Sequence, residues 1–106
     1  MEATLLIYSG RANPKWPVDP AQARAIGAAI DALAEAPPGA VPPPGGLGYS
    51  GVMLDFADAA GARRRAVFAA GRASIDGKLF VDAGRRVERL ILASGRDTIG
   101  SAADLF

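Results

Sequence analysis

The sequence contains neither cysteine nor histidine in its 106 residues. Without cysteine the chain can form no disulfide, no thiolate nucleophile and no zinc–thiolate site. Without histidine it lacks the commonest general base, the commonest metal ligand and the usual titrating group near neutral pH. A Ser-His-Asp or Cys-His nucleophile therefore cannot be built from this chain alone.

Long hydrophobic runs and a strong net charge are also missing. The first residues carry no basic segment, and Leu5-Leu6-Ile7 is too short for the apolar part of a secretory signal. No stretch approaches the roughly 20 apolar residues of a membrane-spanning helix. The net charge of +1 is too small to attract the whole molecule to nucleic acid or to an anionic membrane. We therefore expect a soluble, cytoplasmic protein with neither a membrane nor a nucleic acid as partner.

The composition that is present fits one globular domain. Hydrophobic residues make up 50% of the chain and charged residues 22%, and residues 1–106 are enough for a single core. Residues 37–48 form a Pro/Gly-rich connection, which we interpret as a stiff linker, and Pro38–Pro44 within it is alternatively a ligand for an aromatic-lined groove. Residues 96–106 form a C-terminal tail with an apolar end, expected to dock on the body or on a second copy.

The first half of the chain is predicted to form a strand, a loop and a helix. Thr4–Ser9 is predicted to be a strand, and its two apolar faces favour a central position or a contact with another subunit. We therefore expect a homodimer or another homo-oligomer. Residues 10–18 form the first loop, and Asp19-Pro20 is typical of a helix start. That helix is predicted to run from about Pro20 to Ala36.

The second half reads as a run of strands followed by a helix. The predicted strands, joined by turns at residues 58–61 and 76–77, are Gly51–Ala57, Arg63–Ala70, Ala73–Ile75 and Lys78–Val81. Asp82 is expected to cap a helix that ends at about Ser94, with Glu88 on its solvent side. The order of strand, helix, three or four mostly antiparallel strands and helix predicts an α+β two-layer sandwich.

The first loop and a nearby Gly-rich segment supply the candidate ligand-binding residues. An arginine can pair with a carboxylate or phosphate, an asparagine can bond an amide, and an indole can stack on a flat group. The alternative is structural, because Asn-Pro and Trp-Pro also begin turns and the indole can fasten the loop to the core. The candidate residues are Tyr8, Ser9, Arg11, Asn13, Trp16 and Tyr49.

The same residues carry a resemblance. Ser9-Gly10-Arg11-x-Asn13-Pro14-x-Trp16, together with Gly46-x-Gly48-Tyr49-x-Gly51 and Val87–Leu92, resembles a set of small, poorly characterised bacterial proteins. Those proteins usually have proline where this chain has Ala12. The resemblance spans most of the chain and implies no activity, but it suggests that the loop, the Gly-rich segment and the last helix belong together.

Three other patterns are weaker. Gly46–Gly51 matches G-x-G-x-x-G by letters, but a proline run precedes it and a strand follows, so a loop entering a strand explains it better. Arg63-Arg64-Arg65 is interpreted as the charge of an edge strand, or else as part of a basic surface. The aspartates fit no metal-binding motif, although oxygen ligands for Mg²⁺ or Ca²⁺ remain available.

Two functional hypotheses follow. In the first, the protein is a binding or accessory module that recognises a small molecule or peptide through the first loop, without a cofactor. In the second, it is a cofactor-independent isomerase, cyclase or lyase, with Tyr8, Tyr49 or Asp55 moving protons and Arg11 stabilising an oxyanion. A carboxylate in a closed pocket would favour the enzyme, and a shallow groove would favour the module.

Overall fold

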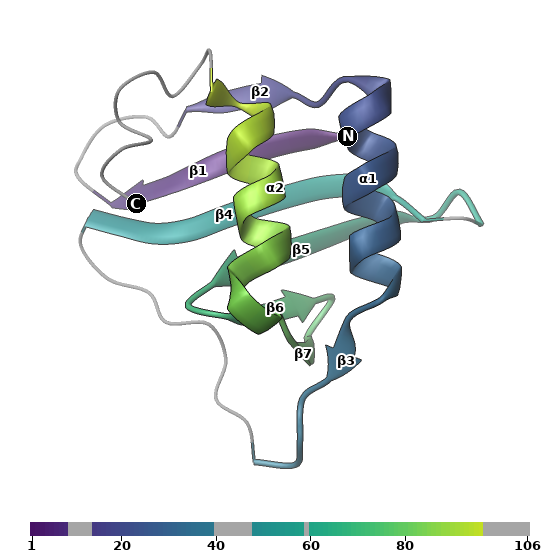
Figure 1. The fold of residues 1–106 in the computed structure, drawn as a ribbon, viewed down its shortest axis with the longest axis vertical. Coiled ribbons are helices and arrows are strands. Elements are labelled where there is room, and N and C mark those ends of the chain that lie inside the picture. Colours follow the sequence, from purple (N-terminus) through teal and green to yellow (C-terminus); the bar gives the residue numbers. More distant parts are fainter. Residues whose placement is uncertain (9–13, 40–47, 59, 97–106) are drawn as a thin grey trace.

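A computed structural model describes residues 1–8, 14–39, 48–58 and 60–96 and shows one antiparallel sheet with two helices on one face (Figure 1). The described strands are β1 (Glu2–Tyr8), β2 (Lys15–Pro17), β3 (Ala34–Glu35), β4 (Gly48–Ala57), β5 (Arg63–Ala69), β6 (Arg72–Ile75) and β7 (Lys78–Val81). Their order across the sheet is β2-β1-β4-β5-β6-β7-β3. The helices are α1 (Pro20–Asp31) and α2 (Arg86–Ser94), the latter preceded by the 3-10 turn Ala83–Arg85. The predicted α+β two-layer class is confirmed.

The core lies between the helices and the inner face of the sheet. Alternate strand residues point to this face, as the period of two requires. The buried apolar residues on the central strands are Ala3, Leu5, Val52, Leu54, Phe56, Ala66 and Phe68, and those on the helices are Ile26, Ala29, Val87 and Ile91. Because β1, β4 and β5 supply most of the sheet side of this core, their register fixes which residues remain for the other face.

Helix α1 begins as predicted and ends earlier. Asp19 accepts a hydrogen bond from the backbone N–H of Gln22 at 3.0 Å, so the predicted cap is confirmed. The helix ends at Asp31 and not at about Ala36. Ala34–Glu35 instead pairs with β7, and the N–H of Ala36 donates to the carbonyl of Leu79. Pairing at the free edge of β7 therefore replaces the last helical turn, although this segment has good helix formers.

The first loop is shorter than predicted, because Lys15–Pro17 is a strand. β2 pairs antiparallel with β1, with Trp16 opposite Ala3. Its side chains alternate, so that Lys15 and Pro17 are exposed while Trp16 is buried. Proline lacks a backbone donor and is tolerated in an edge strand. The segment after β1 therefore returns along the sheet edge before α1 begins.

The two predicted hairpin turns are confirmed. Asp76 and Gly77 have φ angles of 51° and 87°, the left-handed pair that a two-residue turn of this hand needs. At the other turn the Asp58 carboxylate accepts hydrogen bonds from the N–H groups of Ala60 and Ala62, both at 2.9 Å. Short local signals therefore fix the order of β4 to β7.

Helix α2 is capped by Asp82, as predicted, although the helix proper begins later at Arg86. The buried Asp82 carboxylate accepts from the N–H groups of Val87 and Glu88 at 2.9 and 3.1 Å. The expectation that Glu88 faces solvent is wrong, because its side chain is fully buried. Arg85, in the left-handed region with a φ of 58°, turns its guanidinium back onto the Glu88 carboxylate and balances that charge.

Gly51 occupies the closest approach between β4 and β5. It follows a β-bulge, since Leu6 pairs with Gly51 and Ile7 with Tyr49, leaving Ser50 as the extra residue of β4. Its φ is +123°, and a Cβ there would lie 2.2 Å from the carbonyl oxygen of Phe68 and 2.7 Å from Cβ of Ala69. The last glycine of the G-x-G-x-x-G string is thus required by strand packing.

Substitution of Gly51 by alanine should lower the free energy of unfolding by about 2–4 kcal/mol, from backbone strain and overpacking together. Urea unfolding followed by far-UV circular dichroism measures the loss. Gly27→Ala is the matched control, because Gly27 lies within α1 with no atom within 4 Å of an added Cβ. That change should stabilise the protein by about 1 kcal/mol through helix propensity. A Gly51→Ala variant as stable as the wild type would contradict the close approach.

Candidate functional site

The predicted ligand-binding residues fall only partly within the described chain. Ser9, Arg11 and Asn13 lie outside it, and for Tyr8 and Tyr49 only the backbone is described. Strand pairing places Ile7 opposite Tyr49 and Tyr8 opposite Gly48. The backbone at the start of β4 therefore lies beside the end of β1, where the first loop begins. The binding role of these residues stays a prediction.

Trp16 has a structural position in the core. Its side chain is 3% exposed, and its Nε1–H donates to Oγ of Ser94 at 3.0 Å. The Ser94 hydroxyl in turn donates to the carbonyl of Ile91. A Cβ on Gly95 would lie 2.2–2.5 Å from the indole ring, so the ring rests on this backbone. Trp16 thus holds β2 against the end of α2, and little of its ring surface is left for a ligand. This position agrees with the structural alternative for Trp16.

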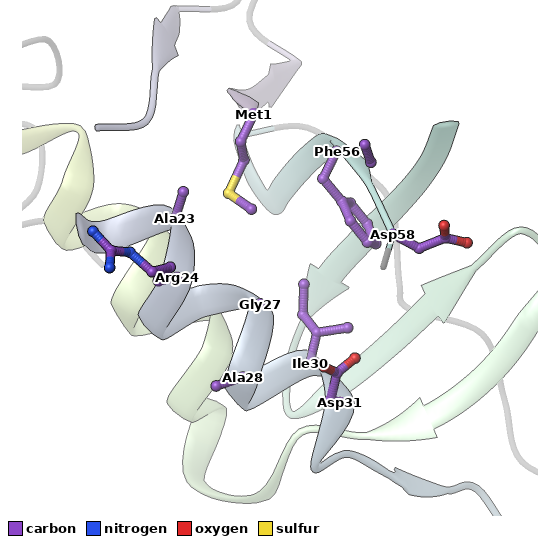
Figure 2. Close-up of a pocket in the computed structure, with 10 residues that line it drawn as sticks. Met1, Ala23, Arg24, Gly27, Ala28, Ile30, Asp31, Phe56 and Asp58 are labelled. Carbon is purple, nitrogen blue, oxygen red and sulfur yellow. The ribbon is translucent and has the colours of Figure 1, made fainter. Parts of the chain in front are cut away.

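A groove beside α1 has a volume of about 580 Å³ (Figure 2). Its apolar surface comes from Met1, Ala23, Gly27, Ala28, Ile30, Phe56 and Ala57. The volume lies within the roughly 300–1,000 Å³ that small-molecule sites occupy. Figure 2 shows Met1, Ile30 and Phe56 converging on the space between α1 and the end of β4.

Gly27 keeps this groove open. It is in the middle of α1, and nothing lies within 4 Å of the position that a Cβ would occupy. Glycine within a helix costs about 1 kcal/mol relative to alanine. Since no described neighbour needs the missing side chain for close packing, the visible effect of Gly27 is a deeper groove at a cost in stability.

Three charged residues border the groove. Figure 2 shows Asp31 and Asp58 on the side of Ile30 and Phe56, whereas the Arg24 side chain extends away from Phe56. The hydrogen bond from Arg64, helped by backbone donors, holds the pKa of Asp58 below its ordinary value. Asp58 is therefore ionised throughout the neutral range. Figure 2 shows the Asp31 carboxylate beside Ile30, whereas the Asp58 carboxylate, bonded by Arg64, points away from the apolar floor.

The arginine run on β5 is paired with aspartates. Arg64 contacts Asp58 at 2.9 Å and Asp76 at 3.0 Å, which joins the two hairpin turns. Arg65 contacts Asp55 across the strands at 2.9 Å. These pairs offset the positive charge that a nucleic-acid surface would need.

The interpretation of β5 as an edge strand is wrong, since β5 lies between β4 and β6. Within β5, β6 pairs with residues 66–69, and among the described strands none pairs with residues 63–65 on that side. The Asp76 turn partly covers this free segment, because its N–H donates to the carbonyl of Arg65 at 3.2 Å. The arginines at the start of β5 thus lie beside the Asp76 turn and not at an exposed sheet edge.

No group of three or more Asp, Glu, His or Cys residues within the described ranges is placed to hold a metal ion. None of the helices in the described part of the chain is long and apolar enough to cross a membrane. Comparison of the chain with protein-family models, with curated proteins and with solved structures gives no match in any of the three.

Sequence reasoning missed the α1 groove. Its floor combines the first residue of the chain, the last inward residue of β4 and one face of a helix, which only the tertiary structure brings together. One signal was present: Gly27 interrupts an otherwise alanine-rich helix. An isolated helical glycine often has a packing or functional reason.

Gly95→Ala should displace the Trp16 ring and lower the free energy of unfolding by about 1–3 kcal/mol, as overpacking does. Trp16 is the single tryptophan, so its fluorescence should move to longer wavelength as the ring gains solvent. Ala93→Ser, at an exposed neighbouring position, should change the stability by less than about 0.5 kcal/mol. Unchanged emission in a folded Gly95→Ala variant would contradict the packing of Trp16 on Gly95.

The lowered pKa of Asp58 predicts a pH dependence. A carboxylate whose pKa is lower in the folded state adds stability above its ordinary pKa of about 3.9 and loses it as the pH falls through the folded value. We expect Asp58→Asn to be less stable than the wild type at pH 6 and the difference to narrow below about pH 4. Urea unfolding at a series of pH values tests this. Curves that remain parallel through the acid range would contradict it.

Proposed function

We propose that the protein is a small binding module and that the groove beside α1 is its recognition site. The observation that carries the proposal is an open apolar groove deepened by a helical glycine that α1 would be more stable without. Ligand sites are typically concave, mostly apolar and bordered by a few polar groups. The groove has this composition, with Phe56 and Ile30 at its floor and two aspartates at its rim.

The charges at the rim favour a ligand with an apolar group and a basic end. The Asp31 carboxylate lies beside Ile30, and the ionised Asp58, whose charge Arg64 partly offsets, lies at the outer rim next to Phe56 with its carboxylate directed outward. An aromatic or aliphatic group of a small molecule or peptide would rest on Phe56 and Ile30. Its ammonium or guanidinium group would then reach Asp31, an attraction of about 1 kcal/mol because this carboxylate is exposed to water.

A binding role agrees better with the groove than catalysis does. General acid–base catalysis near neutral pH is most efficient with a carboxylate whose pKa is raised, whereas the pKa of Asp58 is lowered. The residues of the first loop, Arg11 and Asn13 above all, remain candidates for a second contact with the same or another partner. A bacterial source, a cytoplasmic location and a homo-oligomeric state also remain predictions from the sequence.

The groove can be tested with three small probes that share a phenyl ring: benzylamine, benzyl alcohol and phenylacetate. We expect benzylamine to bind most tightly, with a dissociation constant of about 1 mM, followed by the alcohol and then the acid. Titration of the ¹⁵N-labelled protein should shift the backbone amide signals of Gly27, Ile30 and Phe56. Equal or tighter binding of phenylacetate would contradict the charge preference.

Two leucine variants separate the groove from the rest of α1. Gly27→Leu should fill the groove and abolish the shifts, while the helix stays folded because leucine is a good helix former. Ala25→Leu adds bulk at an exposed position that does not line the groove, and binding should be unchanged. Retention of benzylamine binding by Gly27→Leu would refute the site.

A further inference from the structure

The outer face of the sheet, opposite the two helices, carries more apolar side chains than a solvent-facing surface needs. Both helices lie on the inner face, and no helix in the described part of the chain covers the other one (Figure 1). An antiparallel sheet with one wet face normally alternates apolar and polar residues along each strand. Here the outward positions of β4, β5 and β7 include Met53, Val67, Leu79 and Val81.

Strand register aligns these residues in an uncharged row that ends at the exposed Lys15, which lies opposite Thr4 on β2. Thr4 lies opposite Met53, Met53 opposite Val67, Val67 opposite Ser74, and Ser74 opposite Leu79. Met53, Val67 and Leu79 are half-buried. Val81, next to Leu79 on the same face, is 40% exposed and is the exposed large hydrophobic residue among those described. This row, with Val81, is the outer apolar row.

A pair of opposite charges borders the outer apolar row. Asp55 and Arg65 occupy adjacent strands two residues beyond Met53 and Val67 and lie opposite each other in the register, and the exposed Glu2 of β1 lies on the other side of Asp55. Their ion pair leaves 65% of the arginine side chain and 23% of the aspartate side chain exposed. The guanidinium therefore retains donors that face away from the sheet.

We propose that a second copy of the chain covers this outer face, related by a two-fold axis that lies between β4 and β5 and runs parallel to the strands. A rotation of 180° about this axis places β4 of one copy over β5 of the other. It places Arg65 over the partner's Asp55 and Asp55 over the partner's Arg65. The same rotation places Met53 against the partner's Val67. The cross-strand pair is thus complementary to its own copy, as a two-fold interface requires.

The size of the face agrees with a dimer interface. An axis between β4 and β5 overlays six strands of each copy, from β2 across the sheet to β7, which lie about 4.8 Å apart. Outward side chains cover roughly 20 Å along each of β1, β4 and β5 and roughly 13 Å along each of the shorter β2, β6 and β7. The resulting footprint of roughly 500 Å² is smaller than the ~800 Å² per partner that a standard protein interface buries, so it agrees with a weak dimer. The interface would resemble the aligned packing of two sheets, about 10 Å apart.

Sedimentation and light scattering on the intact chain test the proposal. At about 100 µM, where interfaces of micromolar affinity are filled, we expect twice the mass of the 10.8 kDa chain. Met53→Lys should raise the dimer dissociation constant at least tenfold. Ala25→Lys, on the exposed side of α1, should leave that constant unchanged.

Charge exchange gives the sharper test. Asp55→Arg alone should place like charges against the partner's Arg65 and raise the dissociation constant at least tenfold, and Arg65→Asp alone should do the same with two carboxylates. The double variant restores opposite charges within and between subunits, and the dimer should return. Urea unfolding of each variant at low concentration confirms that it folds. A monomeric wild type, or a dimer indifferent to both single changes and to Met53→Lys, overturns the proposal.

Discussion

The close approach of β4 and β5 at Gly51 and Phe68 holds the register on which both faces of the sheet depend. Because Gly51 has no Cβ, the β5 backbone can approach β4 closely at this point. The Cβ of any other residue there would clash with the carbonyl oxygen of Phe68. A slip of one residue would move Val52, Leu54 and Phe56 from the core to the outer face. The bulge at Ser50 confines the irregularity to the start of β4, so that the rest of the strand alternates regularly.

Helix α1 shows a balance between stability and an open surface. Its start is well fixed by Asp19 and Pro20, and its buried side is held by Ile26 and Ala29. Its middle contains a glycine that contributes no packing within the described structure. The helix ends at Asp31, beside the groove, and the chain then forms the strand β3. The helix therefore forms the groove wall, and the glycine that deepens the groove lowers the stability of the helix.

Sequence reasoning predicted the elements that depend on local signals. The turn at Asp76-Gly77, the cap at Asp19 and the cap at Asp82 each use residues close in the chain, and each was found where expected. The early end of α1 and the strand at Lys15–Pro17 depend instead on free sheet edges formed by distant residues. Local propensity contains no information on such edges.

The same division applies to the candidate sites and to single side chains. Glu88 occupies a helix position that reads as solvent-facing, yet Arg85 allows it to be buried as an ion pair. The α1 groove combines Met1, Gly27 and Phe56, residues that no local pattern connects. From the sequence, Trp16 was a candidate both for ligand binding and for a structural contact. The position of Gly95 under its ring favours the structural contact.

The alternation of β4 separates the two proposed contact surfaces. Phe56 points inward and forms part of the groove floor, whereas its neighbour Asp55 points outward beside Arg65. A second copy on the outer face would therefore leave the groove accessible on the helical side. Each copy of the dimer would present one groove, and the two grooves would face away from each other. Two weak sites on such a dimer could bind a partner with two basic apolar groups more tightly than either site alone, where the partner can span them.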